Sequence, residues 1–154
     1  MKLQKAAVAT LTAALVGASL IGFAGSAQAA GGCRYDYASV GYGYRLEPCI
    51  ETGPGGPENF NAEINVRVDP YSTDVQICGE LVSVSGWGNI DGVEHCAPFA
   101  GTRSAGAVFT TAYTNNEHCP LHTGNALYVY KGYIKESGHV IGDIESPIFT
   151  CPGV

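Results

Sequence analysis

Short runs in which apolar and polar residues alternate recur along the chain, and this two-residue period predicts β-strands. In residues 62–69 (AEINVRVD) every second residue from Ala62 to Val68 is apolar, and the residues between them are polar or charged. One face of this strand is therefore expected to be buried and the other to face solvent. Residues 74–84 (DVQICGELVSV) also alternate, but the apolar positions change phase after Gly79. This change predicts a β-bulge at the glycine.

Further segments have the composition of strands or of hairpins. Aromatic and β-branched residues concentrate in residues 106–114 and 126–134. An opening hairpin is expected around residues 41–43, where two glycines flank a tyrosine. Residues 140–151 are interpreted as a last pair of short strands that is interrupted at Pro147.

Two segments are predicted to be turns or loops from their content of glycine and of residues that tolerate a positive φ angle. Asp91-Gly92 is typical of a two-residue hairpin turn. Residues 51–61 (ETGPGGPENFN) are expected to form the most flexible loop, because glycines and prolines dominate their first half.

The fold class follows from these elements. After residue 29, no segment keeps the i, i+3, i+4, i+7 apolar pattern of a helix over about twelve residues. About seven to nine short strands, with a turn roughly every ten residues, indicate an all-β protein. We therefore predict a single antiparallel β-sandwich stapled by disulfides, with a small β-barrel as the alternative.

The N-terminus has the organisation of a secretory signal peptide. Two lysines form a basic start, an apolar run follows, and Ala27-Gln28-Ala29 supplies small residues at a signal-peptidase site. Residues 1–29 are interpreted as a leader removed after Ala29, and residues 30–154 as a secreted, extracellular β domain. A membrane anchor and a lipoprotein attached at the first cysteine are the alternatives. The absence of a basic cluster after the run and of a lipobox leucine favours cleavage.

All six cysteines follow the predicted cleavage site. An even number of cysteines in an exported chain indicates three disulfides, for which fifteen pairings are possible. Because consecutive strands of an antiparallel sheet are usually neighbours, pairing in sequence order is the preferred hypothesis. No Cys-x-x-Cys motif occurs, which weighs against a zinc ribbon or a thioredoxin-like redox site. The predicted disulfides are Cys33–Cys49, Cys78–Cys96 and Cys119–Cys151.

The charge of the chain limits its partners. It has 8 lysines and arginines against 14 aspartates and glutamates, a formal net charge of −6, and cleavage would remove two of the lysines. An acidic protein with scattered basic residues is a poor match for nucleic acid or for an anionic membrane surface. We therefore expect no nucleic-acid partner, no membrane association after cleavage and no cofactor.

Residues 115–125 (NNEHCPLHTGN) contain the densest group of reactive side chains. His118, Cys119 and His122 would form a zinc site, or a nucleophile with its base, if they came together. Pro120 disfavours the helix that would bring both histidines to one face, and an oxidised cysteine offers no thiolate. A loop fixed by a disulfide is the preferred interpretation, so no metal ligand and no catalytic residue is assigned here.

A Ser-His-Asp site can be drawn from Ser83, Ser85, Asp91 and His95, but no Gly-x-Ser-x-Gly motif supports it. The fourteen carboxylates likewise contain no pair whose spacing singles out a glycosidase. A solvated hairpin tip is the preferred interpretation of the first group.

The tyrosines provide the candidate binding surface. All nine follow the leader, and three pairs are spaced by two residues, so that both rings of a pair fall on one face of a strand. Such rings can form a platform for a sugar or a peptide, although tyrosine is also a good strand former that packs at sheet margins. Trp87 lies between two glycines, a context that fits either the core or the surface. The predicted binding residues are Tyr35, Tyr37, Tyr42, Tyr44, Tyr128 and Tyr130.

These observations leave three functions open. The preferred one is a small secreted, non-catalytic binding module for an extracellular glycan, an envelope component or a protein. The alternatives are a structural cell-surface protein and a small secreted hydrolase whose site is assembled from residues distant in sequence. Rigid, disulfide-linked sheets with exposed aromatic residues suit recognition, which favours the first.

Overall fold

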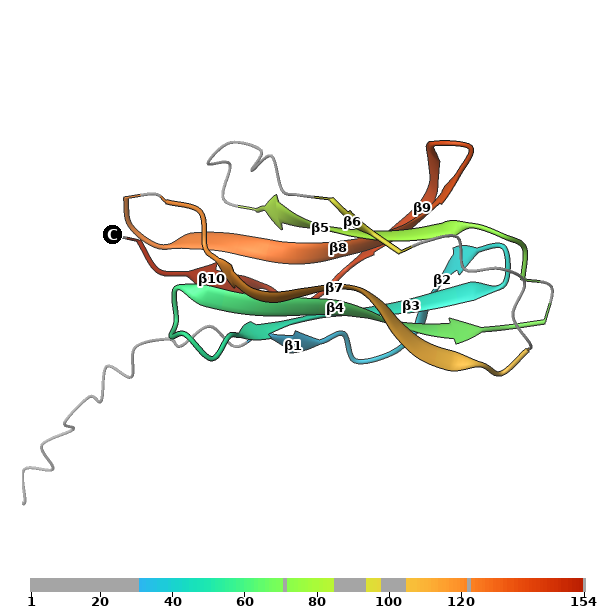
Figure 1. Ribbon diagram of the computed structural model, residues 1–154, viewed down its shortest axis with the longest axis horizontal. Helices are drawn as coiled ribbons and strands as arrows, with labels where there is room; N and C mark the ends of the chain where they lie inside the picture. The colour runs from blue at the N-terminus through green and yellow to red at the C-terminus, as the bar shows by residue number, and fades with distance from the viewer. Residues whose placement is uncertain (1–30, 71, 85–93, 98–104, 122, 154) are drawn as a thin grey trace, which may run out of the picture.

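The computed structural model describes residues 31–70, 72–84, 94–97, 105–121 and 123–153. Within these ranges the chain forms ten β-strands and no helix, and the strands make two antiparallel sheets packed face to face (Figure 1). The predicted β-sandwich is confirmed, and both sheets are open, so the alternative of a closed barrel is not formed. No helix of the described residues has the length and apolar character needed to cross a membrane. The predicted leader, Trp87 and the Asp91-Gly92 turn lie outside the described residues.

The first sheet has the order β1-β3-β4-β7, and β2 also pairs with β3. β4 occupies one edge of β3 along its length, so β1 and β2 lie end to end along the other edge. The predicted opening hairpin is the turn between β2 and β3. The bounds are β1 Gly32–Cys33, β2 Ala38–Gly41, β3 Tyr44–Thr52, β4 Asn59–Val68 and β7 Val108–His118.

The second sheet has the order β10-β8-β5-β6, and β9 also pairs with β8. β9 and β10 lie end to end along β8, which confirms the predicted interruption at Pro147. Proline has no N–H for the ladder, and Ser146 bridges the break: its hydroxyl accepts the Tyr130 N–H at 2.9 Å. The bounds are β5 Gln76–Ser83, β6 His95–Cys96, β8 Ala126–Glu136, β9 His139–Glu145 and β10 Phe149–Cys151.

The core lies between the two sheets. The alternation predicted for residues 62–69 is confirmed, because every second residue from Ala62 to Val68 is buried in β4 and the residues between them are not. Burying one valine or isoleucine side chain stabilises the fold by about 1.5–3 kcal/mol, so this face of β4 contributes strongly. The largest side chains in the core are Tyr44, Tyr128, Tyr130, Phe149, Leu46, Ile50, Ile64, Ile77 and Ile134.

The prediction of a β-bulge at Gly79 was wrong. β5 pairs with β8 residue by residue from Gln76 to Ser83 without a register shift. The glycine is required for a different reason: a Cβ atom added there would lie 2.3 Å from the hydroxyl oxygen of Tyr130 and 2.4 Å from its Cζ atom. Gly79 therefore makes room for a tyrosine ring that packs against the backbone of the neighbouring strand.

The three disulfides join the cysteines in sequence order, which confirms the predicted pairing. Two of them link residues that lie directly opposite each other on paired strands, and each fastens a strand only two residues long. The third ties the residue after β7 to the last strand. The bridges are Cys33–Cys49 between β1 and β3, Cys78–Cys96 between β5 and β6, and Cys119–Cys151.

The loop predicted at residues 51–61 is shorter than expected. Its two ends belong to β3 and β4, and the turn between them is closed by a hydrogen bond from the Gly53 N–H to the Asn59 carbonyl oxygen at 2.8 Å. The Gly55 N–H donates to Asn116 Oδ1 of β7 at 3.2 Å. The turn is therefore held against the neighbouring strand.

Candidate binding site

Three of the six predicted binding tyrosines lie in the core. Tyr44, Tyr128 and Tyr130 are at most 1% exposed, so their rings cannot form part of a surface platform. The Tyr130 hydroxyl donates to the carbonyl oxygen of Ala112 in the opposite sheet at 2.5 Å. For these three the binding prediction is replaced by a packing role. The paired spacing did place Tyr128 and Tyr130 on one face of β8, but that face points inward.

The other three predicted tyrosines are accessible, but none lines the hollow described below. Tyr35 is fully exposed between β1 and β2. Tyr42 lies in the turn after β2, and its hydroxyl donates to a Glu136 carboxylate oxygen at 2.8 Å. Tyr37 is half-buried; burial raises its pKa, Glu47 raises it further, and Arg67 lowers it.

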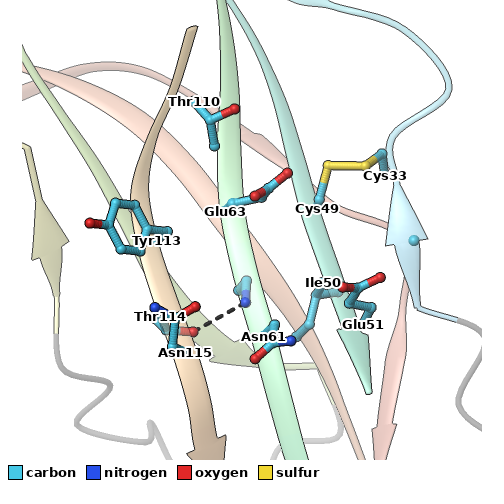
Figure 2. A pocket seen from close by; sticks show the side chains of 12 residues that line it. Cys33, Cys49, Ile50, Glu51, Asn61, Glu63, Thr110, Tyr113, Thr114 and Asn115 are labelled. Carbon is cyan, nitrogen blue, oxygen red and sulfur yellow. Dashed lines mark hydrogen bonds between the residues drawn. A yellow bond between two sulfur atoms is a disulfide. The ribbon is translucent and has the colours of Figure 1, made fainter. Parts of the chain in front are cut away.

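A hollow of about 350 Å³ opens on the outer face of the first sheet (Figure 2). It crosses four strands, so its walls come from segments that are distant in sequence. Its lining residues are Gly32, Cys33, Cys49, Ile50, Glu51, Asn61, Ala62, Glu63, Thr110, Tyr113, Thr114 and Asn115.

Glu63 lies in the middle of this hollow, between the Tyr113 ring on one side and the Cys33–Cys49 disulfide on the other (Figure 2). The placement follows from the register, because Glu63 of β4 lies opposite Cys49 of β3. Two residues along, Asn61 lies opposite Glu51, so an amide and a second carboxylate line the same hollow. The sheet thus presents acceptors and donors around one exposed aromatic ring.

Tyr113 points outward because β7 contains a bulge. Between Thr111 and Thr114, β7 uses one residue more than β4 does over the same pairing. Before the bulge the odd-numbered residues Phe109 and Thr111 are the half-buried ones; after it the even-numbered Ala112 and Thr114 are buried, and Tyr113 is 62% exposed. Bulges re-aim side chains in this way. Without the extra residue, Tyr113 would point into the core.

Where the bulges interrupt the backbone hydrogen bonds between β4 and β7, polar side chains form hydrogen bonds with the backbone instead. Thr114 Oγ1 accepts the Ala62 N–H at 3.1 Å, a hydrogen bond visible in Figure 2. The Asn116 N–H donates to Asn61 Oδ1 at 2.7 Å across a second register shift. These bonds satisfy backbone groups that would otherwise be unpaired and fix the floor of the hollow.

A second hydrogen-bond network fixes the side of the hollow at which Thr110 lies. The Thr110 hydroxyl donates to Asn65 Oδ1 at 2.7 Å, and Asn65 Nδ2 donates to a Glu47 carboxylate oxygen at 3.1 Å. The same Nδ2 atom lies 3.4 Å from Cys49 Sγ. Asn65 therefore connects the Cys33–Cys49 disulfide to β7. Its hydrogen bond also fixes the rotamer of Thr110, which lines the hollow.

The lining of the hollow is acidic and polar. Its described residues include two carboxylates, Glu51 and Glu63, and no lysine or arginine. Within the described part of the chain, neither carboxylate has a hydrogen-bond or ion-pair partner. Carboxylates, amides and hydroxyls beside an aromatic ring suit a ligand that offers both hydroxyl groups and apolar C–H surface.

The disulfide preferred for Cys119 over a metal site or a nucleophile is present. Cys119 is buried in its disulfide, and His118 is exposed at the end of β7. His122 lies outside the described residues. Two clusters have the spacing of metal sites, Cys33/Glu47/Cys49 and Cys78/Glu94/Cys96, but in both the two sulfur atoms are bonded to each other and provide no thiolate.

The alternative of a Ser-His-Asp site is not supported by the strand register. His95 lies opposite Gly79, and Ser83 is four residues further along β5, a separation of about 13 Å at the rise of a strand. Ser85 and Asp91 lie outside the described residues.

The hollow is built from residues that the sequence patterns did not single out. Tyr113 belongs to none of the tyrosine pairs spaced by two residues, and Glu63 was expected only as a solvent-facing residue of a strand. One signal was available: Asn115-Asn116 at the end of the predicted strand, because asparagine tolerates positive φ angles, and Asn116 has φ 52°. Ala112, at φ 48°, gives no such signal.

Comparison with known proteins gives no relative: no family model, no curated protein and no solved structure matches this chain. The class is therefore defined by the fold and the hollow alone, as a disulfide-linked β-sandwich with a polar, aromatic-edged concavity on one sheet.

Proposed function

We propose that the protein is a secreted, non-catalytic recognition module that binds a glycan in the hollow on the outer face of the first sheet. The observation that carries this proposal is the 62% exposed side chain of Tyr113, held by a bulge beside the Glu63 carboxylate, which has no partner among the described residues. Three disulfides support an oxidising compartment outside the cytoplasm.

A glycan fits this surface better than a protein partner does. A sugar ring has an apolar C–H face that packs on an aromatic ring and hydroxyls that bond to carboxylates and amides such as Glu63 and Asn61. A stable protein interface buries about 800 Å² on each side around several apolar anchors. Among the described residues lining the hollow, Tyr113 is the single exposed large apolar side chain.

A hydrolase is the second candidate function, because two carboxylates line one hollow. Glu51 and Glu63 occupy diagonal positions on β3 and β4, and such positions place Cα atoms about 7–8 Å apart. Glycosidases use two carboxyl groups about 5–9.5 Å apart. Rigid cross-strand positions also suit binding, so the test must separate binding from bond cleavage.

The test is a binding screen of the mature protein against soluble polysaccharides and a glycan array, followed by titration calorimetry on the best ligand. Tyr113→Ala is expected to lower affinity by about tenfold or more, about 1.4 kcal/mol. Tyr35→Ala is the matched control, because this fully exposed ring lies outside the hollow. Bound glycan should be recovered intact.

Three outcomes contradict the proposal. Equal losses in Tyr113→Ala and Tyr35→Ala would place binding elsewhere. Cleavage of the glycan that disappears in Glu51→Gln or Glu63→Gln would establish the hydrolase instead. Absence of binding to every glycan would favour the structural cell-surface role.

A further inference from the structure

A second hollow, of about 490 Å³, lies at the edge of the sandwich where β6 and β7 face each other. The opposite edge is closed, because Gly142 of β9 approaches β2 so nearly that an added Cβ would lie 2.2 Å from the Val40 carbonyl oxygen. Among the described residues, the second hollow therefore lies at the edge of the sandwich that carries Tyr113. The residues lining this second hollow are Glu94, His95, Cys96, Ala97, Thr111, Ala112 and Tyr113.

Tyr113 is a lining residue of both hollows. The neighbouring residues of β7 divide in the same way: Thr110 lines the first hollow and Thr111 the second. A ligand that packs on the Tyr113 ring therefore has recognition surface on both sides of β7.

The two hollows differ in charge. Glu63 and Glu51 in the first have no partner within the described residues, whereas Glu94 in the second accepts hydrogen bonds from Lys135 and Tyr133. The described residues that line the two hollows include no lysine or arginine. Within the described part of the chain, a negatively charged ligand would meet carboxylates without basic partners, which disfavours its binding.

We infer that the ligand is a linear, uncharged oligosaccharide that crosses β7, with its middle on Tyr113 and sugar units in both hollows. The inference rests on the proposed glycan-binding function and adds the length, shape and charge of the ligand. A ligand confined to the first hollow would gain nothing from extra units, whereas one that spans both gains contacts with each unit added beyond the ring.

The test uses neutral linear oligomers of β-1,4-linked N-acetylglucosamine, β-1,4-linked glucose and α-1,4-linked glucose, each from two to six units, with oligogalacturonates as acidic chains of equal length. For at least one neutral series, the affinity should rise by about tenfold or more between two and six units. The acidic chains should bind at least about tenfold more weakly than that series.

Two variants assign the gain to the second hollow. His95→Ala removes a lining side chain, and Ala97→Phe fills the hollow from the side of β6; both should abolish the gain with length and leave the affinity for the two-unit oligomer unchanged. That unchanged affinity also shows that each variant is folded. His139→Ala, an exposed histidine on β9, is the matched control and should behave as the unaltered protein does.

The possible failures are distinguishable. A gain with length that persists in both variants, or no gain while Tyr113→Ala still abolishes binding, overturns this inference and leaves the single-hollow site intact. Acidic chains that bind as tightly as neutral ones overturn the charge assignment. If no oligomer binds and the glycan screen is also negative, both the inference and the proposed function are wrong.

Discussion

The Tyr130 hydroxyl and the Ala112 carbonyl oxygen form a buried hydrogen bond, 2.5 Å long, that crosses from the second sheet to the first. Ala112 is the bulge residue with φ 48°, directly before the exposed Tyr113. A tyrosine in the core thus holds the backbone that presents a tyrosine on the surface. This contact connects the packing of the sandwich to the geometry of the candidate site.

Removing that hydroxyl tests the connection. Tyr130→Phe keeps the ring but leaves a buried carbonyl oxygen without its donor, which should lower the free energy of unfolding by about 1–3 kcal/mol. Glycan affinity should fall as well, because the bulge behind Tyr113 loses its partner. Urea unfolding and calorimetry measure the two effects. Tyr35→Phe, with an exposed hydroxyl, should change stability by less than about 0.5 kcal/mol; equal effects in the two variants would contradict the prediction.

Gly79 is predicted to tolerate no side chain while Tyr130 is present. Gly79→Ala should lower the free energy of unfolding by about 1–3 kcal/mol, because its Cβ would overlap the phenol ring. A double-mutant cycle with Tyr130→Leu isolates the clash: the cost of Gly79→Ala should shrink when the ring is removed. Costs that add independently would show that Gly79 acts through backbone conformation alone.

The sequence predicted the parts of the fold that depend on the two-residue period of strands and on the even number of cysteines. The alternation of β4, the interruption at Pro147 and the pairing of six cysteines all follow from local rules. The direction of Tyr128 and Tyr130 is less evident, because the opposite face of β8 also carries the apolar residues Leu127, Val129 and Tyr133 beside its two lysines. A spacing of two residues shows that two rings share a face, not which face is buried.

The candidate site could not be predicted from the sequence for a related reason. It depends on an extra residue in β7 that reverses the alternation, and the residue that adopts the unusual backbone angle is an alanine. The forces that stabilise this angle, such as the Tyr130 hydrogen bond, come from the other sheet. Long-range packing therefore sets the outward direction of the Tyr113 side chain, and no local sequence pattern in residues 106–114 predicts this direction.

The disulfides should separate stability from binding. In the chain-entropy model, Cys119–Cys151, with a sequence separation of 32, contributes about 3–4 kcal/mol, and Cys33–Cys49, with a separation of 16, about 3 kcal/mol. Replacing both cysteines of a bridge by serine should lower stability by about these amounts. Of these two bridges, only Cys33–Cys49 lines a hollow of the proposed site, so its removal should weaken glycan binding and that of Cys119–Cys151 should not. Metal content should stay unchanged in both; zinc lost with Cys119 would restore the metal site.

The stability of the fold should decrease at alkaline pH because of buried tyrosines. Burial raises the pKa of Tyr133, and its hydrogen bond to Glu94 raises it further; burial also raises the pKa of Tyr130. In the unfolded chain both phenols have the ordinary value of 10.0, so above that pH the unfolded state loses protons that the folded state retains. The tyrosine contribution is therefore complete below pH 10 and is lost as the pH rises toward the folded-state values.

Urea unfolding at several pH values between about 8 and 12 measures this loss. The decrease in the free energy of unfolding above pH 10 should be smaller in Tyr133→Phe than in the unaltered protein, whatever the stability of each at neutral pH. Tyr35→Phe is the control, because its phenol is fully exposed and should leave the slope unchanged. An identical slope in Tyr133→Phe and the unaltered protein would mean that the Tyr133 phenol titrates alike in the folded and unfolded chains.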